Sequence, residues 1–284
     1  MTIDEQFRIA TEERIARYVV GIAVEKNAGI GTGTLVLVGG QRYILTAEHV
    51  IGESKQDDIR FWLRPPAAIR QKAAADAEIS EIGEGTFGDR LPIVEIWKDK
   101  TIDIAAMRLD SSWVPPEAVE VYDVRKSLEF MRWDDAKLDG LSLVLFGFPE
   151  GNSKELFTEG NRSFRFLGCA SYLTEYSVEL NKTAWSNFSS ERSPAKEFVF
   201  KYHSILSDIE PHGFSGGAVW VLGDNPNRKI WQPDPILIGV VHHYMRRSGV
   251  LVAAKLPTFI AAELMPAVGS GKVDSGSPVS SETD

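Results

Sequence analysis

Short runs of β-branched and aromatic residues recur along most of the chain, and Gly, Pro, Asn or Asp separates one run from the next. Runs of this kind are typical of β-strands that are joined by turns. Many short strands favour an antiparallel sandwich or barrel, and the strand–helix alternation of a parallel sheet is not visible. The runs are RYVVGIAVEK, GTGTLVLVGG, RYILTAEHVIG, DIRFWLRPP, LPIVEIWKD, DIAAMRLD, LSLVLFGFPEG, SFRFLGCASYL, EFVFKYHSIL, SGGAVWVLGD, PILIGVVHHYM and VLVAAKL.

Helical patterns are visible near the two ends of the chain. Residues 2–17 predict an amphipathic helix, because apolar residues recur at helical intervals after a Thr and a Glu with capping-box spacing. Residues 257–268, with the sequence PTFIAAELMPAV, predict a second helix. Residues 66–90 are rich in Ala and Glu, as in a surface insertion, and the small polar residues 269–284 predict a loose tail.

The composition is that of a globular protein. The 284 residues are 43% hydrophobic, which is enough for a core in one large domain or in two small ones that share a cleft. The formal net charge of −9 disfavours binding to nucleic acid, because an acidic surface repels the phosphate backbone. No apolar run is long enough to span a membrane.

The expected location follows from the cysteine content and the first residues. The single cysteine, Cys169, rules out a disulfide within the chain and is most simply a small buried apolar residue. The first residues, MTIDEQFRIATEERIARYVV, are charged and lack the apolar core of a signal peptide. These observations predict a cytoplasmic protein that binds neither membrane nor nucleic acid.

The stretch PHGFSGGAVW, residues 211–220, surrounds Ser215 with glycines. A serine hydroxyl becomes a nucleophile when a base removes its proton, and the oxyanion that forms on the attacked carbonyl needs hydrogen-bond donors. Gly213 leaves its amide uncrowded and allows unusual dihedral angles, which suits a backbone oxyanion hole. On its own, the stretch fits an ordinary glycine-rich turn equally well.

Two further residues are candidates for the base and the acid of such a site. His49, one of five histidines, follows the apolar run YILT, and Asp103 stands at the head of the apolar run DIAAMRL. A base activates the serine, and a buried acid holds the base in one tautomer. Taken singly, a histidine at a strand end is more often a surface or core residue, and an aspartate there fits a turn as well.

Together, these segments resemble the signature blocks of the trypsin-like serine peptidases. GTGTLVLVGGQRYILTAEHV, DIAAMRL and GFSGGAV resemble that family's G-[ST]-G with L-T-A-x-H-V, D-I-A and G-x-S-G-G blocks, in the same order. VLFGFPEG resembles the Gly-x-Pro turn of bacterial members, and LIGVVHHYM resembles the strand that pairs with substrate. The resemblance covers roughly residues 19–266 and is to the bacterial intracellular type.

The resemblance implies an all-β fold of two antiparallel six-stranded barrels, with the active site in the cleft between them and a helix near each end of the chain. The implied parts are an N-terminal helix at 1–17, a first barrel at 18–125, a second barrel at 126–256, a C-terminal helix at 257–268 and a flexible tail at 269–284.

The resemblance also implies a function. His49, Asp103 and Ser215 match the family's general base, orienting acid and nucleophile, and the amides of Gly213 and Ser215 match its oxyanion hole. A serine endopeptidase of this kind cleaves a polypeptide substrate through an acyl-enzyme and needs no cofactor and no metal. Since an unregulated peptidase would threaten its own cell, we expect a latent enzyme that an activating protein or ligand switches on.

Several positions depart from the family pattern or bear on specificity. Phe214 stands where trypsin has the Asp that receives a newly cut N-terminus, so we do not expect activation by N-terminal cleavage. Glu48 replaces a small residue, and we expect it to face solvent. For His242 two roles stay open, because it can face substrate or replace the family's serine that supports Asp103. The candidate substrate-binding residues are Ile209, at the expected pocket floor, His212, Val241, His242 and His243.

Three other functions remain open. The segment from Gly213 to Gly217 also fits the nucleophile elbow of α/β-hydrolases, although no parallel βα pattern precedes it. The other four histidines, His203, His212, His242 and His243, are conceivable metal ligands but lack a typical ligand spacing. The strongest alternative is a catalytically silent or partner-switched trypsin-like scaffold that acts as a binding module. By analogy, such a module belongs to a bacterial stress or anti-phage system.

Overall fold

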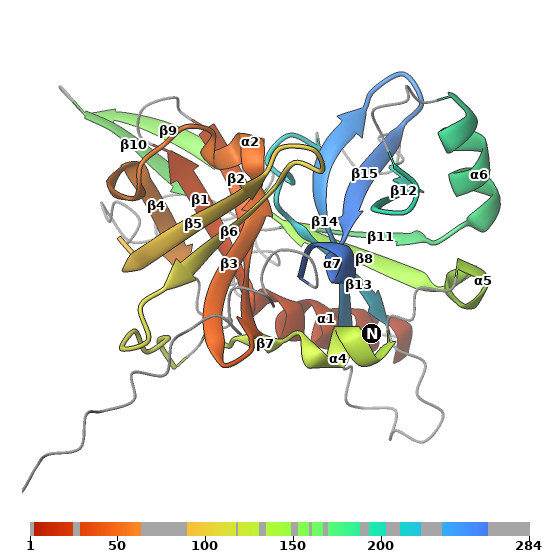
Figure 1. Cartoon of the computed structure of the whole chain (residues 1–284), viewed down its shortest axis with the longest axis horizontal. Coiled ribbons are helices and arrows are strands. Elements are labelled where there is room, and N and C mark those ends of the chain that lie inside the picture. Colours follow the sequence, from red (N-terminus) through yellow and green to blue (C-terminus); the bar gives the residue numbers. More distant parts are fainter. Residues whose placement is uncertain are drawn as a thin grey trace, which may run out of the picture.

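Two β-sheets lie side by side and form the body of the molecule (Figure 1). The computed structural model describes residues 3–24, 29–63, 90–117, 119–130, 135–148, 153–158, 161–166, 170–187, 193–202, 211–222 and 235–260. Among these residues, no helix is both long and apolar enough to cross a lipid bilayer.

Among the described residues, the first sheet has seven strands, where the resemblance implied six. Six of them pair antiparallel in the order β4-β1-β2-β3-β6-β5, and the short β7 pairs with β2 in parallel. Their bounds are β1 Val19–Val24, β2 Gly29–Val38, β3 Gln41–Ala47, β4 Ile59–Leu63, β5 Ile93–Asp99, β6 Ile104–Leu109 and β7 Tyr122–Asp123.

The second sheet has six strands in the order β11-β8-β13-β14-β15-β12, all antiparallel to their neighbours. A separate antiparallel pair joins β9 to β10. The bounds are β8 Ser142–Gly147, β9 Ser153–Thr158, β10 Asn161–Phe166, β11 Ala170–Glu175, β12 Glu197–Lys201, β13 Ala218–Leu222, β14 Pro235–Met245 and β15 Val250–Lys255.

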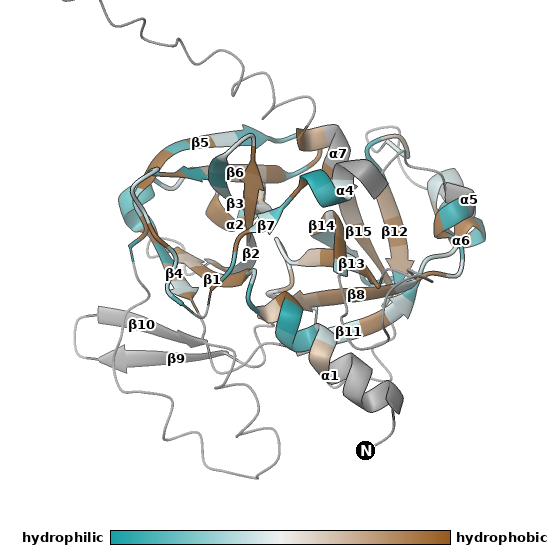
Figure 2. Cartoon of the chain, turned by 90° about the horizontal axis from the view of Figure 1, so that it is seen from below, coloured by the Kyte–Doolittle hydropathy of each residue, from teal (hydrophilic) through white to brown (hydrophobic). Residues whose placement is uncertain are grey.

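Strand β1 of the first sheet is buried on both faces, which explains why it is almost continuously apolar. Along β1, Val20 and Ile22 join a core that belongs to the first sheet alone. Val19 and Ala23, which alternate with them, join the core shared with the second sheet. Because successive side chains of a strand point to opposite faces, a strand between two cores needs apolar residues at every position. Figure 2 shows hydrophobic stretches along strands of both sheets, for example β3 and β8.

An aromatic cluster joins the two sheets. The ring of Trp220 on β13 stacks on Tyr18 at 5.6 Å and meets Tyr122 of β7 edge-on at 5.1 Å. The hydroxyl of Tyr122 also accepts a hydrogen bond of 3.3 Å from the amide of Leu237 on β14. Aromatic pairs of this geometry contribute about 0.5–1.5 kcal/mol each beyond the area that they bury. The cluster therefore fixes the position of one sheet against the other.

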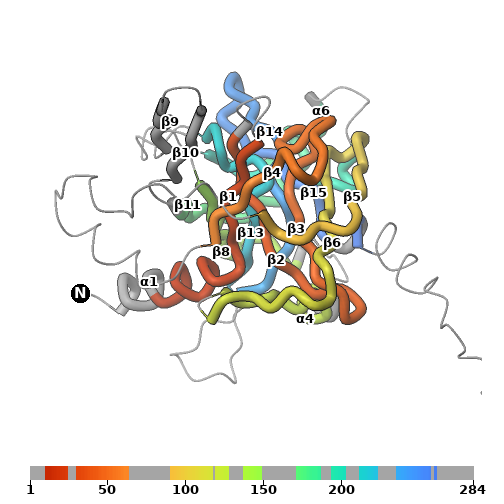
Figure 3. The backbone as a smooth tube through the Cα atoms, turned by 90° about the vertical axis from the view of Figure 1, so that its left-hand side faces the viewer, coloured from red at the N-terminus to blue at the C-terminus, as the bar shows by residue number. Residues whose placement is uncertain are grey.

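Helices lie outside the sheets. Helix α1, Ile3–Ala16, lies below the second sheet in Figure 1, near the region where the sequence predicted a helix at 2–17, and Figure 3 shows it beside β8. The predicted helix at 257–268 begins as α7, Leu256–Phe259, and its remainder after residue 260 lies outside the described residues. The other helices are α2 Glu48–Ile51, the 3₁₀ turn η1 Gln56–Asp58, α4 Arg125–Phe130, α5 Asp135–Leu138 and α6 Val178–Asn187.

Helix α6, which the sequence analysis did not predict, covers the outer side of β12. Its buried Asn181 pairs with Val199 as a strand would, since the side-chain amide donates to the Val199 carbonyl and accepts from the Val199 amide, both at 2.9 Å. The carboxylate of Asp139 caps the first turn by accepting from the amide of Val178 at 2.8 Å. The predicted insertion at 66–90 (except residue 90), the tail at 269–284 and Cys169 lie outside the described residues.

Candidate active site

His49 lies on a short helix that directly follows strand β3. Within α2, Val50 and Ile51 are buried and anchor the turn, and 48% of the His49 side chain is exposed. The apolar run YILT of the sequence therefore ends in the core, and the imidazole that follows it faces solvent.

Asp103 lies in the turn between β5 and β6 and binds His49 through both carboxylate oxygens. Its Oδ2 is 2.7 Å from His49 Nδ1, and its Oδ1 accepts from the His49 amide at 2.9 Å. The amide of Glu48 donates to the Asp103 carbonyl at 3.1 Å. Asp103 has a φ of +53°, a left-handed conformation that costs a non-glycine residue about 1–3 kcal/mol. Strain at this residue, held by three hydrogen bonds, is typical of a functional site.

The electrostatics of the pair favour a charged aspartate and a readily protonated histidine. The hydrogen bond to Asp103 raises the pKa of His49 above its ordinary value, against the opposing effect of burial. Burial raises the pKa of Asp103, but the hydrogen bond to His49 and the charges of His49 and His242 outweigh this effect, so that the pKa is lowered. Glu48 is half-buried, whereas the sequence predicted that it faces solvent, and its charge adds to the rise in the pKa of His49.

The turn that carries Ser215 is bonded to the first sheet through Thr32 of β2. The Thr32 amide donates to the Ser215 carbonyl at 2.9 Å, and the Thr32 hydroxyl donates to the Gly213 carbonyl at 2.9 Å. The same hydroxyl accepts from the amide of Phe148 at 2.9 Å. Thr46 of β3 in turn donates to the Thr32 carbonyl at 2.7 Å. Thr32 is fully buried, so these bonds hold the serine turn without competition from water.

The serine turn packs so closely against the first sheet that only glycine fits directly after Ser215. Gly216 has a φ of +82°, and a Cβ there would overlap the Thr32 carbonyl and the Thr46 hydroxyl and would lie 3.0 Å from the amide nitrogen of Ala47. Ala47 is the last residue of β3 and precedes the helix that carries His49. The residue after Ser215 therefore packs against the chain two residues before His49.

The backbone before Ser215 forms a type II turn. The amide of Phe214 donates to the Pro211 carbonyl at 3.2 Å, and Gly213 has a φ of +90°. Among the described residues, the amides of Gly213 and Ser215 donate no hydrogen bond. Phe214 is buried, and its ring packs against Gly147. A Cβ on Gly147 would lie 2.9 Å from the nearest ring atom of Phe214. An apolar side chain thus anchors the turn.

The remaining candidate residues lie mainly on the strand that pairs with the serine segment. Val241 of β14 accepts from the Gly216 amide at 2.7 Å and donates to the Gly217 carbonyl at 2.8 Å. His243 and His212 are exposed. His242 is only 4% exposed, and its Nδ1 lies 3.8 Å from Asp103 Oδ2. The other two residues, Ile209 and His203, fall outside the described residues.

Two residues at or beside the site have no role predicted from the sequence. Thr32 belongs to the quoted GTG block, which was the signal for it, but its bonds to the serine turn depend on contact between the two sheets. Glu197 has no comparable signal, and its contact with His242 arises because β12 and β14 are both neighbours of β15. Among the described residues, no cluster of His, Cys, Asp and Glu could hold a metal ion.

Comparison with known proteins agrees with this geometry at the level of the fold. No protein-family model and no curated protein sequence matches the chain. Among solved structures, the scabies mite inactivated protease paralogue S-D1 superposes with a TM-score of 0.55 at 12% identity, over 93% of this chain and 95% of that one. The chain has the trypsin-like serine protease fold.

Bacterial structures with this trypsin-like fold are also similar. The secreted serine protease VesC from Vibrio cholerae matches with a TM-score of 0.49 at 14% identity, over 86% of this chain but only 44% of VesC. The serine endoprotease from Yersinia pestis matches with a TM-score of 0.46 at 16% identity, over 94% of this chain and 66% of that one. In this structure, His49 lies on α2 after β3, Asp103 lies just before β6, and Ser215 lies just before β13 of the second sheet.

Proposed function

We propose that the chain is a serine endopeptidase in which His49, Asp103 and Ser215 act as a catalytic triad. The observation that carries this proposal is the 2.7 Å contact between His49 Nδ1 and Asp103 Oδ2. In the same site, Gly216, which follows Ser215, packs against Ala47, two residues before His49. A charged carboxylate at Nδ1 holds the imidazole in the tautomer whose Nε2 accepts a proton. The trypsin-like fold supports this assignment.

The proposed reaction is acyl transfer from a peptide. His49 Nε2 takes the proton of the Ser215 hydroxyl as Oγ attacks the peptide carbonyl, and the amides of Gly213 and Ser215 stabilise the oxyanion. Removing one such donor typically raises the barrier by about 3 kcal/mol. His49 then protonates the leaving amine, and water releases the acyl group by the same steps in reverse order. We further propose that the peptidase works in the cytoplasm and that a partner or ligand regulates it.

A fluorophosphonate probe tests the proposal directly, because it reacts covalently with an activated serine. We expect the wild-type protein to be labelled, Ser215→Ala to be unlabelled, and His49→Ala to be labelled at least 100-fold more slowly. Ser248 is exposed on the turn after β14, so Ser248→Ala serves as the matched control and should be labelled like the wild type.

The outcomes separate the peptidase from a silent scaffold. Labelling that persists in Ser215→Ala would place the reactive group elsewhere and refute the triad. A wild-type protein that is never labelled would favour the trypsin-like scaffold that binds a partner without cleaving it. If Ser215 is labelled, mass spectrometry of cleaved peptide libraries should identify the preferred residue before the scissile bond.

A further inference from the structure

Three ionisable side chains that acyl transfer does not use are buried in the second sheet. Glu197 on β12 is 3% exposed, His242 on β14 is 4% exposed, and Lys255 on β15 is 6% exposed. Burying a charged group costs several kcal/mol unless it is paired. A sheet interior that holds all three is therefore expected to pair them, and their neighbours show how.

His242 lies between the carboxylates of Asp103 and Glu197. Its Nδ1 is 3.8 Å from Asp103 Oδ2, and its Nε2 is 3.0 Å from Glu197 Oε1. The Nε2 contact is close but does not have the alignment of a hydrogen bond. Each of the two ring nitrogens thus faces a carboxylate.

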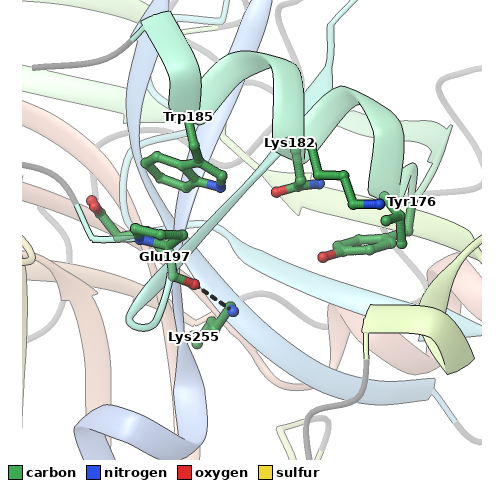
Figure 4. A pocket seen from close by; sticks show the side chains of 8 residues that line it. Tyr176, Lys182, Trp185, Glu197 and Lys255 are labelled. Carbon is green, nitrogen blue, oxygen red and sulfur yellow. Dashed lines mark hydrogen bonds between the residues drawn. The ribbon is translucent and has the colours of Figure 1, made fainter.

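The protein fixes Glu197 on the side away from Asp103. Glu197 Oε2 accepts from the amide of Ser193 at 3.1 Å, and the ammonium of Lys255 donates to the carbonyl of Pro194 at 2.7 Å. Glu197 and Lys255 also line a cavity of about 270 Å³ beneath α6, and Figure 4 shows them across from Trp185 and Lys182 of that helix. Glu197 and His242 thus link this cavity to the candidate catalytic acid, Asp103.

We propose that Glu197 is a positioning residue that acts through His242, holding its imidazole beside Asp103 so that the Asp103 carboxylate stays turned toward His49. This inference rests on the proposed function. The ionisable groups next to His242 are Asp103 and Glu197. His49 lies on the other side of Asp103, and Lys255 lines the same cavity as Glu197.

The arrangement around Asp103 explains why such support matters. Both of its oxygens bind His49, and its backbone is strained, so the carboxylate needs a partner on its remaining side. The charge of His242 is one of the effects that lower the pKa of Asp103. His242 is buried and would not touch a substrate, so its loss should lower kcat and leave KM unchanged.

The test compares Glu197→Gln, His242→Phe and the double variant, with Lys182→Ala as control. Lys182 is exposed and lines the same cavity as Glu197. We expect labelling of Ser215 to slow by about 10- to 100-fold in His242→Phe, as for small displacements of catalytic groups. Glu197→Gln should slow it about tenfold, and the double variant should be no slower than His242→Phe because Glu197 acts only through His242.

A spectroscopic measurement gives an answer that does not depend on activity. The proton between His49 Nδ1 and Asp103 should produce a downfield ¹H resonance in the wild type. We expect it to move upfield or broaden in Glu197→Gln and to stay unchanged in Lys182→Ala. An unchanged resonance in a folded Glu197→Gln, or additive effects of the two substitutions on labelling, would overturn the inference. A wild type without labelling would instead defeat the proposed function, while the resonance would still test the positioning.

Discussion

Thr32 offers the sharpest test of how the serine turn is held. The substitution Thr32→Val replaces the hydroxyl by a methyl group of similar size. It therefore removes the donor to the Gly213 carbonyl and the acceptor for the Phe148 amide, both at 2.9 Å and both in a fully buried site. A buried backbone group that loses its partner costs about 1–3 kcal/mol, so the two together should cost about 2–6 kcal/mol.

Thr32→Ser is the matched variant, because it keeps the hydroxyl and loses only a methyl group, which costs about 1 kcal/mol. Urea unfolding followed by tryptophan fluorescence would measure both free energies. Since a domain is stable by about 5–15 kcal/mol, Thr32→Val should still fold at low temperature. The folded variant should also be labelled more slowly by the fluorophosphonate, because the Gly213 carbonyl is no longer held. Equal free energies of unfolding for the two variants would refute the role given to these hydrogen bonds.

Three further predictions concern the same site. Because Asp103 raises the pKa of His49 and the base must be neutral, labelling of Ser215 should decline in acid with a midpoint above about 6.5, and a pH profile with a lower midpoint would contradict this. Gly216→Ala should abolish labelling and lower the melting temperature, because its Cβ would overlap the backbone of β2; wild-type labelling would show that the turn is not as tightly packed as described. Phe214→Ala should cost about 3–5 kcal/mol in urea unfolding and Phe214→Leu about 1 kcal/mol, whereas similar small losses would mean that the ring does not anchor the turn.

Much of the fold could be predicted from local patterns. The run VVGIAV is apolar at every position because β1 lies between two cores, and a strand of that kind is recognisable without its partners. Helix α6 was missed because its pattern is weak, and because it depends on a cap from Asp139 and on the pairing of Asn181 with β12. Those contacts join residues that are distant in sequence, so no short window contains them.

The sequence by itself determined which residue types are available for chemistry, in what order they come, and which runs form strands, since these properties depend on neighbouring residues along the chain. Only the tertiary structure decided that Thr32 holds the serine turn and that Gly216 packs against Ala47, just before His49. It also decided that His242 lies between Glu197 and Asp103. The physical reason is that such contacts depend on the pairing order and register of strands and on the packing of one sheet against the other. These are set by the balance of burial and hydrogen bonding over the whole chain.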